Sequence, residues 1–228
     1  MKTTLSPTFA ALALLLTAAL PAQAQGVTGD VKAGQSKAAM CIGCHGIQGY
    51  QSTFPEVYKV PRIAGQSGKY IALSLESYKK GDRKHPTMRS IAISLTEQDM
   101  ADLGAYYAQL GVKEGAPELP QPAAPSAQVN QLLQKGACVS CHGDNFSKPI
   151  DPSYPKIAGQ YPDYMFVALK AYRDNVHQTW GRANPIMAGM AKQFSNAELK
   201  AMSAYIGSLP SELKTVPQQR FRWGAGDQ

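Results

Sequence analysis

The chain has 228 residues, of which 44% are hydrophobic and 17% are charged, and its formal net charge is +7. This composition is typical of a folded globular protein and excludes a disordered or low-complexity chain. The positive net charge fits an ordinary solvated surface, which is the interpretation we favour. The alternative is a basic face that attracts an acidic partner or a membrane surface. We expect no nucleic-acid partner, because the chain carries no nucleic-acid recognition motif.

The first 24 residues have the pattern of a secretory signal peptide. A positive start at Met1–Lys2 precedes an apolar run from Phe9 to Leu20, and Ala22-Gln23-Ala24 matches a small-x-small cleavage signal. The apolar run of about 12 residues is shorter than the ~20 residues that span a bilayer, which argues against a membrane anchor. We therefore expect a periplasmic, soluble protein, cleaved before Gln25.

All four cysteines lie in two copies of one short motif. Residues 41–45 are Cys-Ile-Gly-Cys-His, and residues 138–142 are Cys-Val-Ser-Cys-His. Cys-x-x-Cys-His is the attachment signal of c-type haem, in which the two thiols bond to two vinyl groups and the histidine binds the iron. A redox dithiol would not explain the histidines, and a zinc site would need ligands from both motifs. We predict two covalently bound haem c groups, held by Cys41, Cys44 and His45, and by Cys138, Cys141 and His142.

The sequence around the two motifs is duplicated as well. Val60-Pro-Arg-Ile-Ala-Gly-Gln66 matches Tyr154-Pro-Lys-Ile-Ala-Gly-Gln160. Between the copies, residues 111–126 contain four prolines, which break helices and favour an extended connector. We therefore divide the chain into a signal peptide (1–24), an N-terminal domain (25–112), a linker (113–126) and a C-terminal domain with a tail (127–228).

Each copy shows helical patterns and no convincing strand pattern, so the predicted fold class is all-α. The apolar spacing and the position of the motifs predict helices over 30–40, 67–80, 127–136 and 161–172. The last helix of each copy is expected to begin at a capping box, at Thr96-x-x-Asp99 and at Ser195-x-x-Glu198. An insertion over 175–181 occurs only in the second copy. We interpret the tail from residue 211 as a strap over the other domain.

The sixth iron position decides whether a haem carries electrons or performs catalysis, because an open position admits substrate. When the copies are aligned by their last helices, Met88 lies opposite Met187, and each precedes the cap of that helix by a similar distance. We assign Met88 and Met187 as the second axial ligands. Methionine raises the reduction potential relative to a second histidine, which suits electron transfer.

The other methionines and histidines are interpreted as core or surface residues rather than as iron ligands. Met190 is the nearest rival of Met187, but it lies opposite Ile91, which cannot bind iron. His85 is opposed by Asn184 in the second copy, so we interpret His85, like His177, as a surface residue. The methionines assigned to core packing are Met40, Met100, Met165 and Met202.

Taken together, the two Cys-x-x-Cys-His motifs, the repeated Pro-x-Ile-Ala-Gly-Gln segments, the two methionines and the capped last helices resemble the cytochrome c4 family. The resemblance covers essentially the whole chain after the leader. It implies two tandem class I cytochrome c domains related by internal duplication, packed with their haem edges near the interface. It also implies that the carbonyls of Pro61 and Pro155 accept hydrogen bonds from the proximal histidines and orient them. The 175–181 insertion and the Arg/Trp-containing tail depart from the family pattern and fit a dedicated partner.

The resemblance implies a periplasmic electron carrier with two low-spin His/Met haems rather than an enzyme. Its implied partners are redox proteins: a terminal oxidase, a bc1-type donor or a periplasmic dehydrogenase. Two alternatives stay open. The chain is either the dihaem cytochrome subunit of a periplasmic oxidoreductase such as flavocytochrome c sulfide dehydrogenase, or an enzyme in its own right, such as a dihaem peroxidase or a thiosulfate dehydrogenase. The matched methionines argue against the enzyme.

Overall fold

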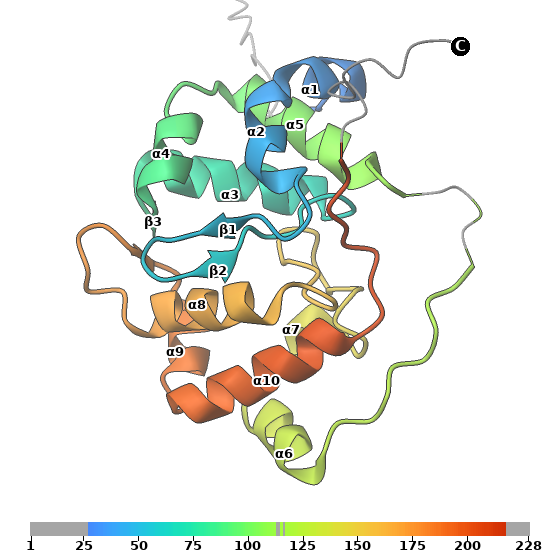
Figure 1. Cartoon of the computed structure of the whole chain (residues 1–228), viewed down its shortest axis with the longest axis vertical. Helices are drawn as coiled ribbons and strands as arrows, with labels where there is room; N and C mark the ends of the chain where they lie inside the picture. The colour runs from blue at the N-terminus through green and yellow to red at the C-terminus, as the bar shows by residue number, and fades with distance from the viewer. Residues whose placement is uncertain (1–26, 113–114, 116, 218–228) are drawn as a thin grey trace, which may run out of the picture.

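The computed structural model describes residues 27–112, 115 and 117–217, so the predicted signal peptide lies outside the described residues. The chain forms two helical domains stacked along the long axis of the molecule (Figure 1). The helices of the N-terminal domain are α1 (Val31–Lys37), α2 (Ala39–His45), α3 (Gly68–Lys80), α4 (Pro86–Ala92) and α5 (Glu97–Gln109). Those of the C-terminal domain are α6 (Ala127–Lys135), α7 (Val139–His142), α8 (Pro162–Arg173), α9 (Pro185–Ala191) and α10 (Asn196–Ser208).

The helix-rich architecture confirms the predicted fold class. In the described part of the chain, no helix has the length and apolar character needed to cross a bilayer. Four strands of two residues each were not predicted, since two residues are too few to show an alternating pattern. Strand β1 (Gln51–Ser52) pairs antiparallel with β2 (Tyr58–Lys59) within the N-terminal domain. Strand β3 (Arg83–Lys84) pairs antiparallel with β4 (Gly181–Arg182) and so joins the two domains.

The predicted helix starts are largely confirmed. Both capping boxes are present, with Thr96 and Ser195 at the N-caps of α5 and α10. The helix expected over 30–40 differs, because it is interrupted at Ala38. The backbone of Ala38 (φ −71°, ψ −4°) ends α1 and begins α2, so the first Cys-x-x-Cys-His motif lies on a helix of its own.

Each domain has its own hydrophobic core, built around its last helix. The stripe of Met100, Leu103 and Tyr107 on α5 is buried, as the spacing predicts. The corresponding apolar stripe on α10 is buried in the C-terminal core, together with Met165. Burying one such side chain fully contributes roughly 1.5–3 kcal/mol, so these stripes hold each domain together. The core role predicted for Met40 is wrong: it is 62% exposed, on the solvent side of α2.

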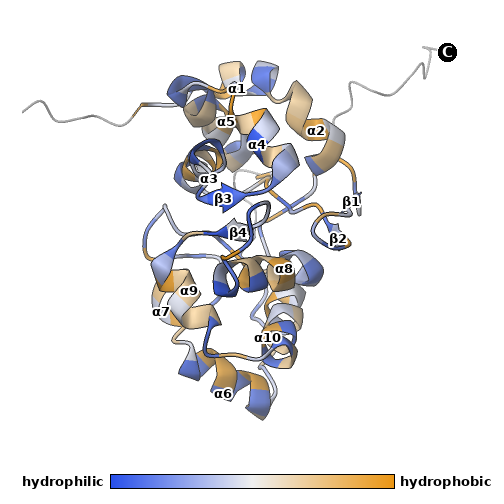
Figure 2. Ribbon diagram, turned by 90° about the vertical axis from the view of Figure 1, so that its left-hand side faces the viewer, coloured by the Kyte–Doolittle hydropathy of each residue, from blue (hydrophilic) through white to orange (hydrophobic). Residues whose placement is uncertain are grey.

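The interface between the domains is polar, in contrast to the two cores. Figure 2 shows hydrophilic residues where β3 meets β4. Ion pairs cross the interface between Lys59 and Asp163 (3.0 Å) and between Lys170 and Glu56. The two domains therefore recognise each other through directional contacts, which fix one relative orientation.

The chain after α10 returns to the N-terminal domain. Leu213 is buried, and the backbone N–H of Lys214 donates to the carbonyl of Ala64 at 3.0 Å. The Lys214 ammonium donates to the carbonyl of Gly111 at 2.8 Å. We call residues 211–217 the strap. The aromatic and arginine residues of the tail, from residue 220 onward, lie outside the described residues.

Candidate functional site

Each Cys-x-x-Cys-His motif ends in a histidine whose ring is oriented by one proline carbonyl. His45 is the last residue of α2, and its Nδ1 lies 2.9 Å from the carbonyl oxygen of Pro61. His142 is the last residue of α7, and its Nδ1 lies 3.0 Å from the carbonyl oxygen of Pro155. A carbonyl accepts only, so it holds the proton on Nδ1 and leaves the Nε2 lone pair available for a metal.

Burial favours the neutral form of both imidazoles. Burial lowers the pKa of His45 and of His142, because a desolvated ring disfavours positive charge, and the hydrogen bonds to the proline carbonyls oppose that shift only in part. A neutral imidazole is the form that donates an electron pair to iron. The histidines are thus held in both the tautomer and the charge state that a proximal ligand needs.

The cysteines lie beside these histidines with all four sulfur atoms available. None of the four is in a disulfide, and each is half-buried. Cys41 packs against the N-terminal core and Cys138 against the C-terminal core, where burial raises the pKa of both thiols. Between residues 27 and 217, the described residues contain no cluster of three or more His, Cys, Asp and Glu side chains suited to a metal ion.

The two candidate methionines lie at equivalent positions of two short helices. Both α4 and α9 have proline in the first turn, and in each the N-cap side chain accepts a hydrogen bond from the backbone N–H of the methionine. That N-cap is His85 for Met88 (3.3 Å) and Asn184 for Met187 (2.9 Å). Both methionines are half-buried, whereas the rival Met190 is exposed. The sequence alignment of the copies therefore has a structural counterpart, and the role of the two methionines as ligands stays a prediction.

The interpretation of His85 as a surface residue is wrong. It is half-buried, and its Nε2 lies 3.0 Å from the hydroxyl of Tyr58, while its Nδ1 caps α4. The signal was available in the sequence, because a residue before a helix-initiating proline is an N-cap candidate. His177 is exposed, as expected, and stacks on Trp180 with ring centroids 4.1 Å apart.

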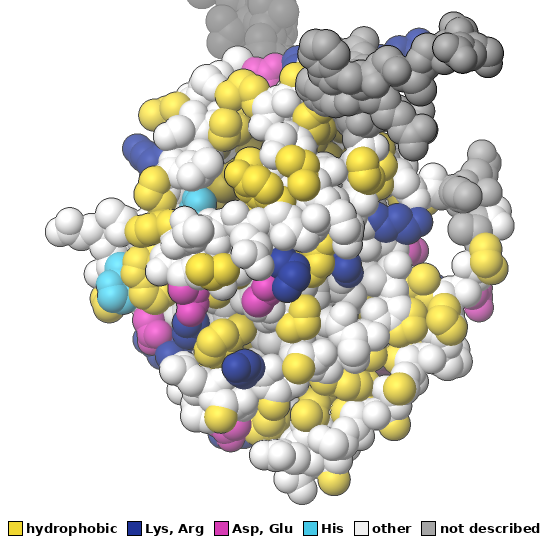
Figure 3. Space-filling model, in the orientation of Figure 1, with side chains coloured by type: hydrophobic (Ala, Val, Ile, Leu, Met, Phe, Trp, Pro, Cys, Tyr) yellow, Lys and Arg dark blue, Asp and Glu magenta, His cyan; other side chains and the backbone are white. Residues whose placement is uncertain are grey.

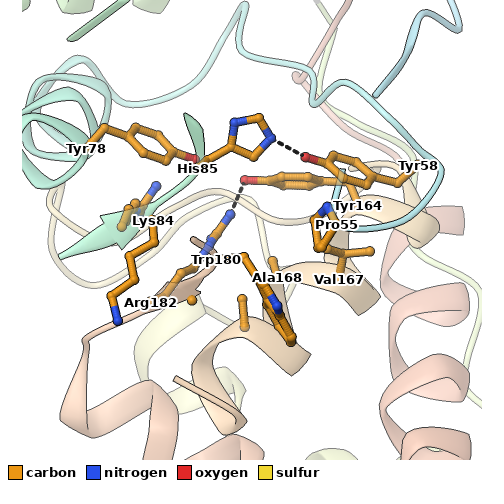
Figure 4. A pocket seen from close by; sticks show the side chains of 13 residues that line it. Pro55, Tyr58, Tyr78, Lys84, His85, Tyr164, Val167, Ala168, Trp180 and Arg182 are labelled. Carbon is orange, nitrogen blue, oxygen red and sulfur yellow. Dashed lines mark hydrogen bonds between the residues drawn. The ribbon is translucent and has the colours of Figure 1, made fainter. Parts of the chain in front are cut away.

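A small cavity between the domains is lined by Arg182, which Figure 4 labels, and by Arg83. Arg182 donates to the hydroxyl of Tyr164 at 2.9 Å, and Arg83 donates to the hydroxyl of Tyr70 at 3.1 Å. Arg182 is buried and Arg83 half-buried, yet neither forms an ion pair with a carboxylate among the described residues. Tyrosine rings stack on both guanidinium groups, and a negatively charged group in this cavity would find two positive charges to bind. Sequence reasoning missed both arginines, although each stands two residues before an N-cap.

The residues present fit a haem c group in each domain. A haem needs two thiols on one edge, a neutral imidazole below the iron, a sixth ligand and cations for its two propionates. The two domains supply the thiols, the imidazoles and the thioethers, and their shared cavity supplies the guanidinium groups.

Comparisons with known proteins agree with this chemistry. The family model described as cytochrome c matches the chain twice, over residues 31–111 and 126–210. A cytochrome c4 of Pseudomonas aeruginosa is 32% identical over 207 residues, which are 87% of this chain and 97% of that protein. A thiosulfate dehydrogenase electron acceptor of Stutzerimonas stutzeri is 28% identical, over 83% of this chain and 90% of that protein.

Solved structures show the same similarity. The crystal structure of reduced cytochrome c4 from Pseudomonas stutzeri matches with a TM-score of 0.58 and 28% identity, over 80% of this chain and 100% of that chain. A thiosulfate dehydrogenase from Marichromatium purpuratum matches with a TM-score of 0.58 and 26% identity, over 79% of this chain and 40% of that chain.

Proposed function

This chain belongs to the cytochrome c4 family, whose members are electron carriers, and from that premise we propose that it binds two covalent haem c groups and transfers electrons between periplasmic redox proteins. It is an electron-transfer protein rather than an enzyme. One observation carries the proposal: each Cys-x-x-Cys-His motif ends in a histidine whose Nδ1 is hydrogen-bonded to a proline carbonyl.

We assign a separate task to each group of residues. When bound, each haem supplies an iron that exchanges one electron. The cysteine sulfurs would hold it covalently, the histidine Nε2 and the methionine sulfur would bind its iron, and the proline carbonyl would orient the imidazole. The residues assigned to the first haem are Cys41, Cys44, His45, Met88 and Pro61. Those assigned to the second are Cys138, Cys141, His142, Met187 and Pro155.

The interdomain arginines support this assignment. Arg83 and Arg182 lack carboxylate partners among the described side chains, and the propionates of two haems would provide the missing negative charge. Because both arginines lie in one cavity, the propionate edges of the two haems would point toward each other. Such an arrangement favours electron exchange between the domains.

We place the protein in a respiratory chain, with a bc1-type donor, a terminal oxidase or a periplasmic dehydrogenase as partners.

A second candidate function is that of a dedicated electron acceptor for one periplasmic dehydrogenase. Two relatives named thiosulfate dehydrogenase electron acceptor, at 27% and 28% identity, favour it. The exposed part of the 175–181 insertion, with His177 stacked on Trp180, offers a feature that such a partner would contact. Size-exclusion chromatography of the native protein separates the two, because a dedicated partner would co-elute and a freely diffusing carrier would elute alone.

Haem content and axial ligation test the proposal directly. The alkaline pyridine haemochrome spectrum is expected to give two haems per chain, and acidified acetone is expected to extract neither. Met88→Ala and Met187→Ala are each expected to remove half of the methionine–iron charge-transfer absorption of the oxidised protein. Met190→Ala is the matched control and should retain all of it. If Met88→Ala and Met187→Ala both kept the full charge-transfer absorption, the assignment of these methionines as ligands would be overturned.

A further inference from the structure

Two glutamines form reciprocal contacts across the domain interface. Gln160, in the C-terminal domain, donates through Nε2 to the carbonyl of Arg62 and accepts through Oε1 from the N–H of Arg62, both at 2.9 Å. Gln66, in the N-terminal domain, donates to the carbonyl of Lys156 and accepts from its N–H, also at 2.9 Å. Both glutamines are about 95% buried, with 4% of Gln66 and 5% of Gln160 exposed.

The residue that each glutamine binds has a special place in the chain. Arg62 follows Pro61, so the N–H of Arg62 and the carbonyl of Pro61 are the two ends of one peptide group. That carbonyl accepts the hydrogen bond from His45. A continuous path therefore runs from the His45 Nδ1–H, through a single peptide group, to Oε1 of Gln160. The same path runs from His142, through the Pro155–Lys156 peptide, to Oε1 of Gln66.

Hydrogen bonds in such a series strengthen one another. A peptide whose N–H is donated to a good acceptor carries more negative charge on its carbonyl oxygen, and each bond gains about 10–30% in strength. A stronger acceptor at Nδ1 makes the imidazole a better donor to the metal and tunes the site. The effect is largest in a buried setting, where water does not compete, and both amide groups are buried.

We propose that Gln66 and Gln160 are positioning residues that act across the interface, each tuning the proximal histidine of the opposite domain. The inference rests on the proposed function, because it concerns histidines that bind haem iron. It makes the reduction potential of each haem depend on a side chain from the other domain. A protein of this design senses, at each iron, whether its two halves are in contact.

The experiment uses the haem-loaded, reduced, full-length protein, labelled with ¹⁵N-histidine. Replacing Gln160 with methionine keeps the length of the side chain and removes the amide. The His45 Nδ1–H proton resonance is expected to shift upfield, because its hydrogen bond weakens, and the potential of the N-terminal haem is expected to rise. The His142 resonance is expected to stay in place. Gln66→Met should give the reverse pattern, with His142 shifted and His45 unchanged.

Two further variants separate tuning from damage to the interface. Glu56→Gln removes the ion pair with Lys170 across the same interface without touching either path, so both resonances should stay unchanged. Gln160→Asn, a milder change, shortens the side chain so that it cannot form both bonds to Arg62. It should shift the His45 resonance in the same direction as Gln160→Met, and it serves as the test if the methionine variant does not retain haem.

The outcomes distinguish this inference from the proposed function. A wild-type protein without two axial imidazole signals would overturn the proposed function. A wild-type protein with both signals, in which the Gln160 variants shift His142 or neither histidine, would overturn the inference alone.

Discussion

Arg83 and Arg182 are register partners in the β3–β4 pair, so two positive side chains from different domains lie at the same point of the interface. Each is bonded to a tyrosine of its own domain, Tyr70 or Tyr164. Two like charges in a buried setting repel each other and lose hydration; tyrosine rings that stack on both guanidinium groups offset part of this cost, and a negatively charged ligand would offset more. The pair is therefore where we expect the carboxylates of the proposed cofactors.

Replacing Arg182 with methionine tests this relationship in the haem-loaded protein. We expect the free energy of unfolding to fall by about 3–5 kcal/mol, the usual cost of leaving one partner of a buried ion pair unpaired. The reduction potential of the haems should also fall, because the substitution removes a nearby positive charge and a positive charge favours the reduced iron. Urea unfolding and a redox titration measure the two effects. The exposed Lys192→Met is the control and should change neither. An unchanged potential in the Arg182 variant would contradict the proposed location of the propionates.

His85 as the N-cap of α4 gives a second prediction. In His85→Ala the backbone N–H of Met88 loses its acceptor, so we expect stability to fall by about 1 kcal/mol in urea unfolding. His85→Asn should recover much of that loss, because asparagine caps the equivalent helix α9 through Asn184. Equal loss in both variants would mean that the contact with Tyr58, and not the cap, is what stabilises the segment.

The crossing of α1 over α5 depends on a glycine. A Cβ on Gly34 would lie 2.0 Å from the backbone oxygen of Asp102, so Gly34→Ala forces the helices apart. We expect a loss of about 1–3 kcal/mol, the usual cost of overpacking. Gln35→Ala, at an exposed position on the same helix, should stay within about 0.5 kcal/mol of the wild type. Chemical denaturation of both variants checks this, and a neutral Gly34 variant would argue against the close approach.

Acid sensitivity of the N-terminal domain follows from a second contact between α1 and α5. The ammonium of Lys37 lies 2.7 Å from Asp99 and 2.5 Å from Asp102. Hydrogen bonds from Lys37 and Thr96 lower the pKa of Asp99, and hydrogen bonds from the Asp30 backbone and Lys37 lower that of Asp102. Their folded-state pKa values lie below the unfolded value of about 4, so the stabilisation is present above that pH and is lost as the pH falls further.

Lys37→Met should therefore lower the melting temperature at pH 7, and its difference from the wild type should shrink below about pH 4, once the carboxylates take up protons. Thermal unfolding followed by circular dichroism measures both values. Lys32→Met, at an exposed position on the same helix, is the control. A difference that stays constant into acid would mean that Lys37 acts through its aliphatic packing.

Features repeated in both copies could be predicted from the sequence. The Cys-x-x-Cys-His motifs, the capping boxes at Thr96 and Ser195 and the buried stripes on the last helices each rest on local chemistry or spacing. The break at Ala38 could not be foreseen, because alanine favours helix and the break depends on how α2 packs. The residue type of Met40 favours the core, but nothing in its spacing indicates which side of the helix is buried.

Contacts between the copies were the main part that the sequence did not predict. Gln66 and Gln160 stand out as a repeated motif, but a repeat does not say that each glutamine binds the opposite domain. The half-buried position of His85 is hard to predict for a related reason, because its partner Tyr58 lies on a strand of only two residues. Contacts across an interface depend on how two folded domains pack together, and the local hydrophobic periodicity of the sequence does not indicate that packing.

The strap brings the chain from the C-terminal domain back to the domain in which the helices began. The C-terminal half is thus joined to the N-terminal half by a peptide connection over residues 117–126 and, separately, by the hydrogen bonds of Lys214 to Ala64 and Gly111. A protease that cuts between residues 117 and 126 would sever only the first of these ties. The two fragments would migrate as one species under native conditions and separate in denaturant, so an intact elution profile would be poor evidence of an intact chain.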